Sequence, residues 1–172
     1  LSNNNLLTSL TLDGLGTLTS IDLTNNPLLT LLGMEGSQLD VIDLSNNINL
    51  EELRINNNKL SSLDLSNNTK LKILNCASQF ADPQAPGVLS SLDISDSADL
   101  ENLHIENNSL TSIDLSSNVN ITELNVSTNP LTSLDVSDLT NLENFWVNNN
   151  TSLECVKVNQ NHETIFYYSN GR

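Results

Sequence analysis

Only a few side chains of this sequence could bind a ligand or take part in catalysis. His104 and Glu106 are two residues apart, and Trp146 is the only tryptophan in the sequence. A His–Glu pair on one side of a strand could move a proton, but catalysis would also require a nucleophile or a metal beside it. The sequence contains neither a glycine-rich phosphate loop nor a His/Cys cluster at metal-ligand spacing. These residues therefore favour binding over catalysis, and we expect a non-enzymatic protein without a cofactor.

Six aspartates form a second regular set, each followed two residues later by Ser or Thr. They are Asp22, Asp43, Asp64, Asp93, Asp114 and Asp135. If they line up across stacked strands, about 4.8 Å apart, neighbouring carboxylates repel each other by about 1 kcal/mol in water. Hydroxyls and backbone donors could offset this repulsion, and so could Ca²⁺, which prefers hard oxygen ligands. A weak calcium site and a solvated ladder therefore both stay open.

The charge of the chain excludes some classes of partner. It has 6 Lys+Arg against 21 Asp+Glu, for a formal net charge of -15. A chain without a basic stripe is not expected to bind nucleic acid or anionic membrane surfaces. Its apolar runs are also too short to insert into a bilayer.

A nine-residue block with apolar residues at positions 1, 4 and 6 accounts for most of the sequence, including its 33 Leu and 29 Asn. We call the two alternating sets of blocks A and B. The A blocks start at Leu18, Leu39, Leu60, Leu89, Leu110 and Leu131. The B blocks start at Leu7, Leu29, Leu50, Leu71, Leu100, Ile121 and Leu142. An A block and the following B block together span a period of 21 residues.

This period predicts a solenoid with little or no α-helix. Alternation of apolar and polar residues around positions 4 and 6 is typical of a half-buried strand. Two such segments and two turns use all 21 residues, so each unit is one coil with two extended segments. About seven coils would stack through a parallel sheet and share a continuous Leu-rich core.

The asparagines at position 9 are expected to pair the backbone groups that the turns bury, because an amide both donates and accepts. The A blocks would form one ladder, and the B blocks a second. The members of the first are Asn26, Asn47, Asn68 and Asn118, and those of the second are Asn58, Asn108, Asn129 and Asn150.

Thirteen such blocks in register, for example LTSIDLTNN from Leu18 and LEELRINNN from Leu50, resemble leucine-rich repeats. Both halves of each unit carry the block, as in the nested 21-residue subtype of secreted and surface bacterial proteins. The resemblance covers about residues 1–158. It implies a right-handed, curved solenoid that binds other molecules, and a secreted or cell-surface location.

The ends and one interruption define the expected domains. Residues 1–151 form the solenoid, which starts inside a repeat, so an N-terminal cap is expected to be missing from this chain. Residues 152–172 are expected to be the last, degenerate repeat and a C-terminal cap. An insertion of eight residues around 79–88, rich in Pro, is predicted to be a loop that is either a decoration or part of a binding face.

Outward positions differ between the two block types. A blocks repeat a Ser–Asp–Ser pattern, whereas B blocks change from coil to coil, which suits recognition of a specific partner. The candidate ligand-binding residues are Glu52, Arg54, Asn75, His104, Glu106, Glu123, Asn125 and Trp146. We expect a monomer that binds a protein or a glycan. A carbohydrate-binding module centred on Trp146 and a structural spacer that displays another domain are the alternatives.

Overall fold

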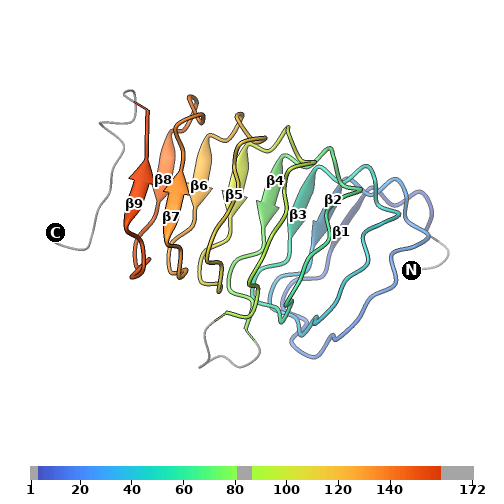
Figure 1. Ribbon diagram of the computed structural model, residues 1–172. Helices are drawn as coiled ribbons and strands as arrows, with labels where there is room; N and C mark the ends of the chain where they lie inside the picture. The colour runs from blue at the N-terminus through green and yellow to red at the C-terminus, as the bar shows by residue number, and fades with distance from the viewer. Residues whose placement is uncertain (1–3, 81–86, 160–172) are drawn as a thin grey trace.

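The computed structural model describes residues 4–80 and 87–159, and shows a stack of coils that runs from one end of the molecule to the other (Figure 1). Seven strands from the B blocks form one parallel sheet in the order β1-β2-β3-β4-β5-β6-β8. Their bounds are β1 Ser9–Thr11, β2 Leu31–Gly33, β3 Glu52–Arg54, β4 Ile73–Asn75, β5 Asn102–His104, β6 Glu123–Asn125 and β8 Asn144–Trp146. The expected β-solenoid of about seven coils is therefore confirmed. Within the described ranges, no helix is long and apolar enough to cross a membrane.

Equivalent repeat positions pair directly across this sheet. Leu53 of β3 lies opposite Leu74 of β4, and Leu124 of β6 lies opposite Phe145 of β8. A shift by one residue would move every core side chain to the solvent side, so the apolar pattern holds the register. The same register places the outward residues of successive strands in straight rows.

Of the two extended segments predicted for each coil, those of the A blocks mostly lack strand pairing. On this side of the described structure, only the A block at Leu131 and the degenerate repeat at Leu153 form strands, β7 (Ser133–Asp135) and β9 (Cys155–Lys157), which pair in a separate two-stranded sheet (Figure 1). In earlier A blocks, position 4 is only half-buried at Ile42 and Ile113. A hollow of about 380 Å³ also opens between residues 90–95 and 112–117. These features indicate that the coils lie farther apart on this side than at the seven-stranded sheet.

The core consists of the residues predicted for it. Position 1 of the A and B blocks is fully buried at Leu39, Leu50, Leu71 and Leu110, for example. Cys76 replaces the usual aliphatic residue at position 6 and is fully buried as well. The Leu-rich core is thus continuous from coil to coil, as a stacked repeat requires.

The first asparagine ladder connects consecutive A-block turns. The buried Asn47 amide donates to the carbonyl oxygens of Leu23 at 3.2 Å and Asn26 at 2.9 Å, both in the preceding coil. Asn68 repeats these bonds one coil later, to Leu44 and Asn47. The amides therefore pair turn carbonyls that stacking removes from water.

The second ladder connects the B-block turns, and Asn58, Asn108 and Asn129 use both ends of the amide. Asn58 donates to the carbonyl oxygens of Met34 and Ile55, while its Oδ1 accepts from the backbone N–H of Leu39. Gln79 is fully buried at the equivalent position and donates to the Ile55 carbonyl oxygen at 2.7 Å. Gln79 therefore acts as a ladder residue, although it lies within the range 79–88 expected for the insertion.

The two ends of the insertion lie next to each other. The Val88 N–H donates to the Gln79 carbonyl oxygen at 2.6 Å, so the chain returns to the point from which it departed. A Cβ on Gly87 would lie 2.5 Å from the Asn107 carbonyl oxygen, so only glycine fits there. Most of the predicted loop and most of the predicted C-terminal cap, residues 81–86 and 160–172, lie outside the described part of the chain. The domain boundaries stay predictions.

Replacing Asn68 with Ala should lower the free energy of unfolding by about 1–3 kcal/mol, because buried carbonyl oxygens lose their amide donor. The neighbouring Asn67 is exposed, so Asn67→Ala is the matched control. Urea unfolding measures both variants. Equal stability of the two would contradict a structural role of the ladder.

Ser97 takes the ladder position of its coil, where its buried hydroxyl has no hydrogen-bond partner among the described residues. Ser97→Asn would place an amide near the carbonyl oxygens of Leu65 and Asn68, which accept only backbone bonds in the described structure. We expect a gain of about 1 kcal/mol in the free energy of unfolding. Ser97→Ala, which only removes the unpaired hydroxyl, should be close to neutral. A loss of stability in Ser97→Asn greater than in Ser97→Ala would show that the position cannot accept the larger side chain.

Candidate ligand-binding face

The parallel register brings the predicted binding residues to one side of the molecule. We use the term variable face for the outward side chains of the seven-stranded sheet together with the residue two places after each strand. Arg54, Asn75, His104, Asn125 and Trp146 form one row across β3, β4, β5, β6 and β8. Glu52 and Glu123 lie in the row before it, and Glu106 in the row after it.

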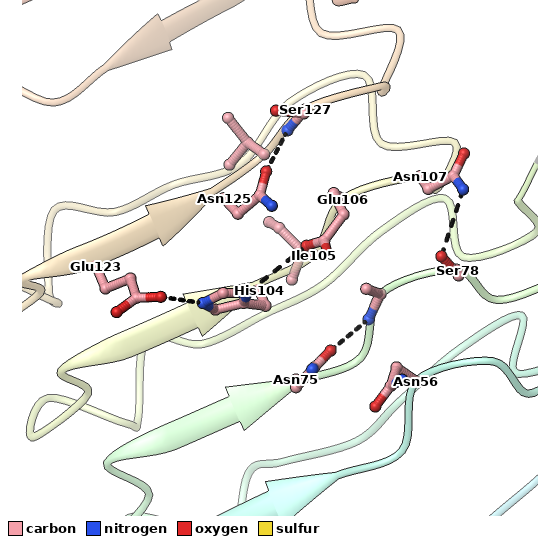
Figure 2. Close-up of polar contacts among 12 residues, drawn as sticks. Asn56, Asn75, Ser78, His104, Ile105, Glu106, Asn107, Glu123, Asn125 and Ser127 are labelled. Atoms are coloured by element: carbon pink, nitrogen blue, oxygen red, sulfur yellow. Dashed lines mark hydrogen bonds and ion pairs between the residues drawn. The ribbon is translucent and has the colours of Figure 1, made fainter. Parts of the chain in front are cut away.

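His104 contacts acidic side chains from two coils (Figure 2). Its Nε2 lies 2.8 Å from Oε1 of Glu123 on the neighbouring strand, and its Nδ1 lies 4.0 Å from Oε2 of Glu106. The sequence spacing pointed to Glu106 as the partner of His104, whereas the shorter contact is to Glu123. The parallel pairing of β5 with β6 decides this choice, because it places Glu123 diagonally beside the imidazole.

Aromatic and amide groups adjoin this cluster. The rings of His104 and Trp146 approach to 6.3 Å between centroids, although β6 lies between their strands. Asn125 lies between them in the row, and its Oδ1 accepts from the N–H of Ser127 at 3.1 Å. This bond holds the amide of Asn125 in place, while Nδ2 of the same side chain makes no hydrogen bond within the described structure. Trp146 is half-buried, so its ring is partly supported by its neighbours and partly open to solvent.

Arg54 belongs to a second, smaller cluster. Its guanidinium lies 2.5 Å from Oε1 of Glu52 on the same strand, and about half of its side chain is exposed. Asn75 separates this ion pair from the cluster around His104. The structure therefore brings Glu106, Glu123, Asn125 and Trp146 together around His104, and leaves Glu52 and Arg54 as a separate pair.

Sequence reasoning did not select two residues of the variable face that the structure singles out. The Oδ1 atoms of Asn56 and Asn148 are buried and have no hydrogen-bond partner among the described residues. The Oε2 atom of Glu106, at the same repeat position in another coil, is buried in the same way and likewise makes no hydrogen bond. Their shared position, two residues after the strand, is the sequence signal that would have grouped them.

The aspartate row on the opposite side is paired within its own turns. Oδ1 of Asp43 accepts from both the hydroxyl of Ser45, at 2.6 Å, and its N–H, at 2.9 Å. The hydroxyl bond, then the backbone bond, lowers the pKa of Asp43. The pKa of every other member of the row is lowered as well. In Asp64, Asp93 and Asp114 the backbone bond has the larger effect and the hydroxyl the smaller, and the Lys157 ammonium contributes most to lowering the pKa of Asp135 to about 2. These bonds give each carboxylate a local structural role.

The described residues contain no group of three or more His, Cys, Asp or Glu side chains placed to hold a metal ion. Calcium binding by the aspartate row stays a hypothesis. Burial raises the pKa of the Cys76 thiol to about 12, so this cysteine is not a reactive thiolate. Cys155 is exposed and free.

Comparisons with known proteins identify the fold. No family model and no curated protein matches the sequence. Among solved structures, the functional domain of InlJ from Listeria monocytogenes, described as including a cysteine ladder, is 27% identical with a TM-score of 0.57. The internalin InlF from the same species is 24% identical with a TM-score of 0.64. A leucine-rich repeat protein from Leptospira interrogans is 20% identical with a TM-score of 0.65.

These matches cover most of this chain, namely 94%, 88% and 88% in the same order, but only 46%, 47% and 37% of the other chains. The chain thus spans less than half the length of each. By its fold, the chain is a leucine-rich repeat protein. Its repeat fits the nested 21-residue type, since both halves of each coil carry the same block.

The aspartate row predicts loss of stability in acid. Because the pKa values of these carboxylates lie below the ordinary aspartate value of 3.8 in the folded state, their stabilisation is complete above that value. It is lost as the pH falls from about 4 towards the folded pKa values, the lowest being about 2 for Asp135. The midpoint of thermal unfolding should therefore be nearly constant from pH 6 to 5 and fall below about pH 4. A midpoint that does not change down to pH 2 would contradict the structural role of the row.

Proposed function

We propose that this protein is a non-enzymatic recognition module that binds a protein or a glycan through its variable face. The observation that carries the proposal is the cluster in which Trp146, Asn125 and His104 lie in one row beside two glutamates. Aromatic rings flanked by groups that can form hydrogen bonds are common anchors of interfaces. The aspartate row, by contrast, repeats one local hydrogen-bonded unit and offers little that could distinguish partners.

The scaffold suits recognition because its binding residues stand on paired strands. The amides of Asn75 and Asn125 are each held by a bond to a backbone N–H two residues later. The imidazole of His104 is held by Glu123. Binding would therefore order few side chains, which reduces the entropic cost of association.

A secreted or surface-attached bacterial location accompanies this proposal. It is supported by the similarity to internalins from Listeria monocytogenes and to a leucine-rich repeat protein from Leptospira interrogans. The chain spans under half of each of these structures, so any partner of the whole protein is likewise a proposal. We propose that the module acts as a monomer.

One observation favours a glycan as the ligand. Trp146 offers a partly open ring, and Asn125 and Asn148 offer amide groups next to it. A sugar stacks on such a ring through its C–H face and exchanges hydrogen bonds with amides. A carbohydrate-binding module centred on Trp146 is therefore the second candidate.

The test compares the wild-type chain with Trp146→Ala and Asn125→Ala on a glycan array and in affinity capture from cell extracts. A ligand of the variable face should lose at least about tenfold in affinity in Trp146→Ala, because truncation of a central aromatic anchor typically costs 2 kcal/mol or more. Binding constants for each captured ligand are measured by calorimetry.

Ser112→Ala is the matched control, since Ser112 is exposed on the aspartate side and makes no described side-chain contact. Thermal unfolding checks that all variants are folded. A ligand that is lost equally in the control and in the Trp146 variant would contradict the variable face as the binding surface. Absence of any ligand would favour the structural spacer instead.

A further inference from the structure

We propose that the variable face from β5 to β8 binds a basic polypeptide segment, in which Lys or Arg side chains enter the cluster of Glu106, Glu123 and Trp146. This inference rests on the proposed function and deepens it by naming the chemistry of the partner. Three independent features of the face support it, namely its charge, its unpaired oxygens and its aromatic ring.

The charge of the variable face is strongly one-sided. Its acidic members are Asp13, Glu35, Glu52, Glu106 and Glu123. Its only Lys or Arg is Arg54, which already pairs with Glu52. Among the described residues, His104 is the one positively chargeable group paired with Glu106 and Glu123, and the His104–Glu106 separation of 4.0 Å leaves Glu106 weakly paired. Electrostatic complementarity therefore selects a partner with positive charge.

The buried side-chain atoms of the described variable face that lack a hydrogen bond are all acceptors. Within the region from β5 to β8, Oε2 of Glu106 and Oδ1 of Asn148 are buried acceptors without a hydrogen bond in the described structure. They occupy the same repeat position on coils two strands apart, so they are about 9.6 Å apart at the usual strand spacing. Lys and Arg carry three and five N–H donors and no acceptor, so their chemistry complements a face whose buried unpaired atoms are acceptors.

Trp146 adds an attraction for cations. An ammonium or guanidinium group placed over an indole face gains about 0.5–2 kcal/mol, and more as the site loses water. The Trp146 ring is half-buried and lies 6.3 Å from the His104 ring, at the centre of the acidic cluster. A basic side chain bound beside His104 therefore lies near both Glu123 and the indole.

The aspartate row is also negatively charged, but its carboxylate oxygens already accept hydrogen bonds. Each carboxylate there already accepts bonds from the Ser or Thr of its own turn, and Asp135 also accepts from Lys157. The row can attract a basic partner only diffusely, by its charge. Comparison of the two faces thus separates a specific site from the general attraction of a chain with a net charge of -15.

The experiment titrates short oligolysine and oligoarginine peptides into the protein at about 0.15 M salt, where diffuse attraction is screened beyond about 8 Å. Trp146 is the only tryptophan, so its fluorescence reports occupation of the cluster directly. An oligoglutamate peptide of the same length is the ligand control. For the variant in which Trp146 is replaced, calorimetry measures the dissociation constant in place of fluorescence.

Glu106→Gln and Asp114→Asn are the matched variants, because each removes one negative charge, from the variable face and the aspartate row respectively. We expect Glu106→Gln to weaken binding of the basic peptides about fivefold and Asp114→Asn to leave it within error. Trp146→Leu should weaken it about three- to thirtyfold. Thermal unfolding confirms that the variants are folded.

Equal weakening by Glu106→Gln and Asp114→Asn would overturn the proposal, since only diffuse attraction would be at work. Absence of binding by the basic peptides would overturn it as well. If a glycan or a protein without a basic segment binds in a manner that depends on Trp146, the proposed function stands and this inference fails. If no ligand of any class depends on Trp146, both fail.

Discussion

Every other feature of this protein depends on the stacking of its coils at hydrogen-bonding distance. Stacking buries the carbonyl oxygens of two turns per coil, and a buried carbonyl without a donor costs free energy. The amides of Asn47 and Asn58, and of Gln79 in the longest coil, supply that donor from the next coil. Each amide therefore connects two coils, and the Leu-rich core between them can remain apolar throughout. The ladders and the core are two consequences of the same spacing.

The same stacking makes the two sides of the solenoid chemically different. On the side of the seven-stranded sheet, outward residues from successive coils meet in rows, so that His104 contacts Glu123 and approaches Trp146. On the other side, each aspartate bonds within its own turn, as Asp43 does with Ser45, and among the described coils only β7 and β9 pair as strands. Negative charge is present on both sides. On the aspartate side it is used to hold turns, whereas Glu106 on the variable face keeps an oxygen without a hydrogen bond.

Most of the fold could be predicted from the sequence because the repeat is regular. The spacing of Leu predicted the coils, the core and the parallel sheet, and the position of Asn predicted both ladders. The pattern did not predict which extended segments pair as strands: among the described residues, only β7 and β9 do so on the aspartate side. A residue pattern does not contain the distance between coils. Gln79 shows a related limit, because its longer side chain reaches the ladder carbonyl from a position that looked like the start of an insertion.

The sequence by itself determined which side chains point outward on the variable face, because strand alternation and a constant period fix direction and row. Trp146, His104 and Glu106 were all identified in that way. Only the tertiary structure decided which of them interact. The contact of His104 with Glu123, the approach of its ring to Trp146 across Asn125, and the unpaired oxygens of Asn56 and Asn148 all depend on neighbours from other coils. Such contacts join residues 19 to 42 positions apart, and they depend on how far each side chain leans across the strands, which local sequence does not encode.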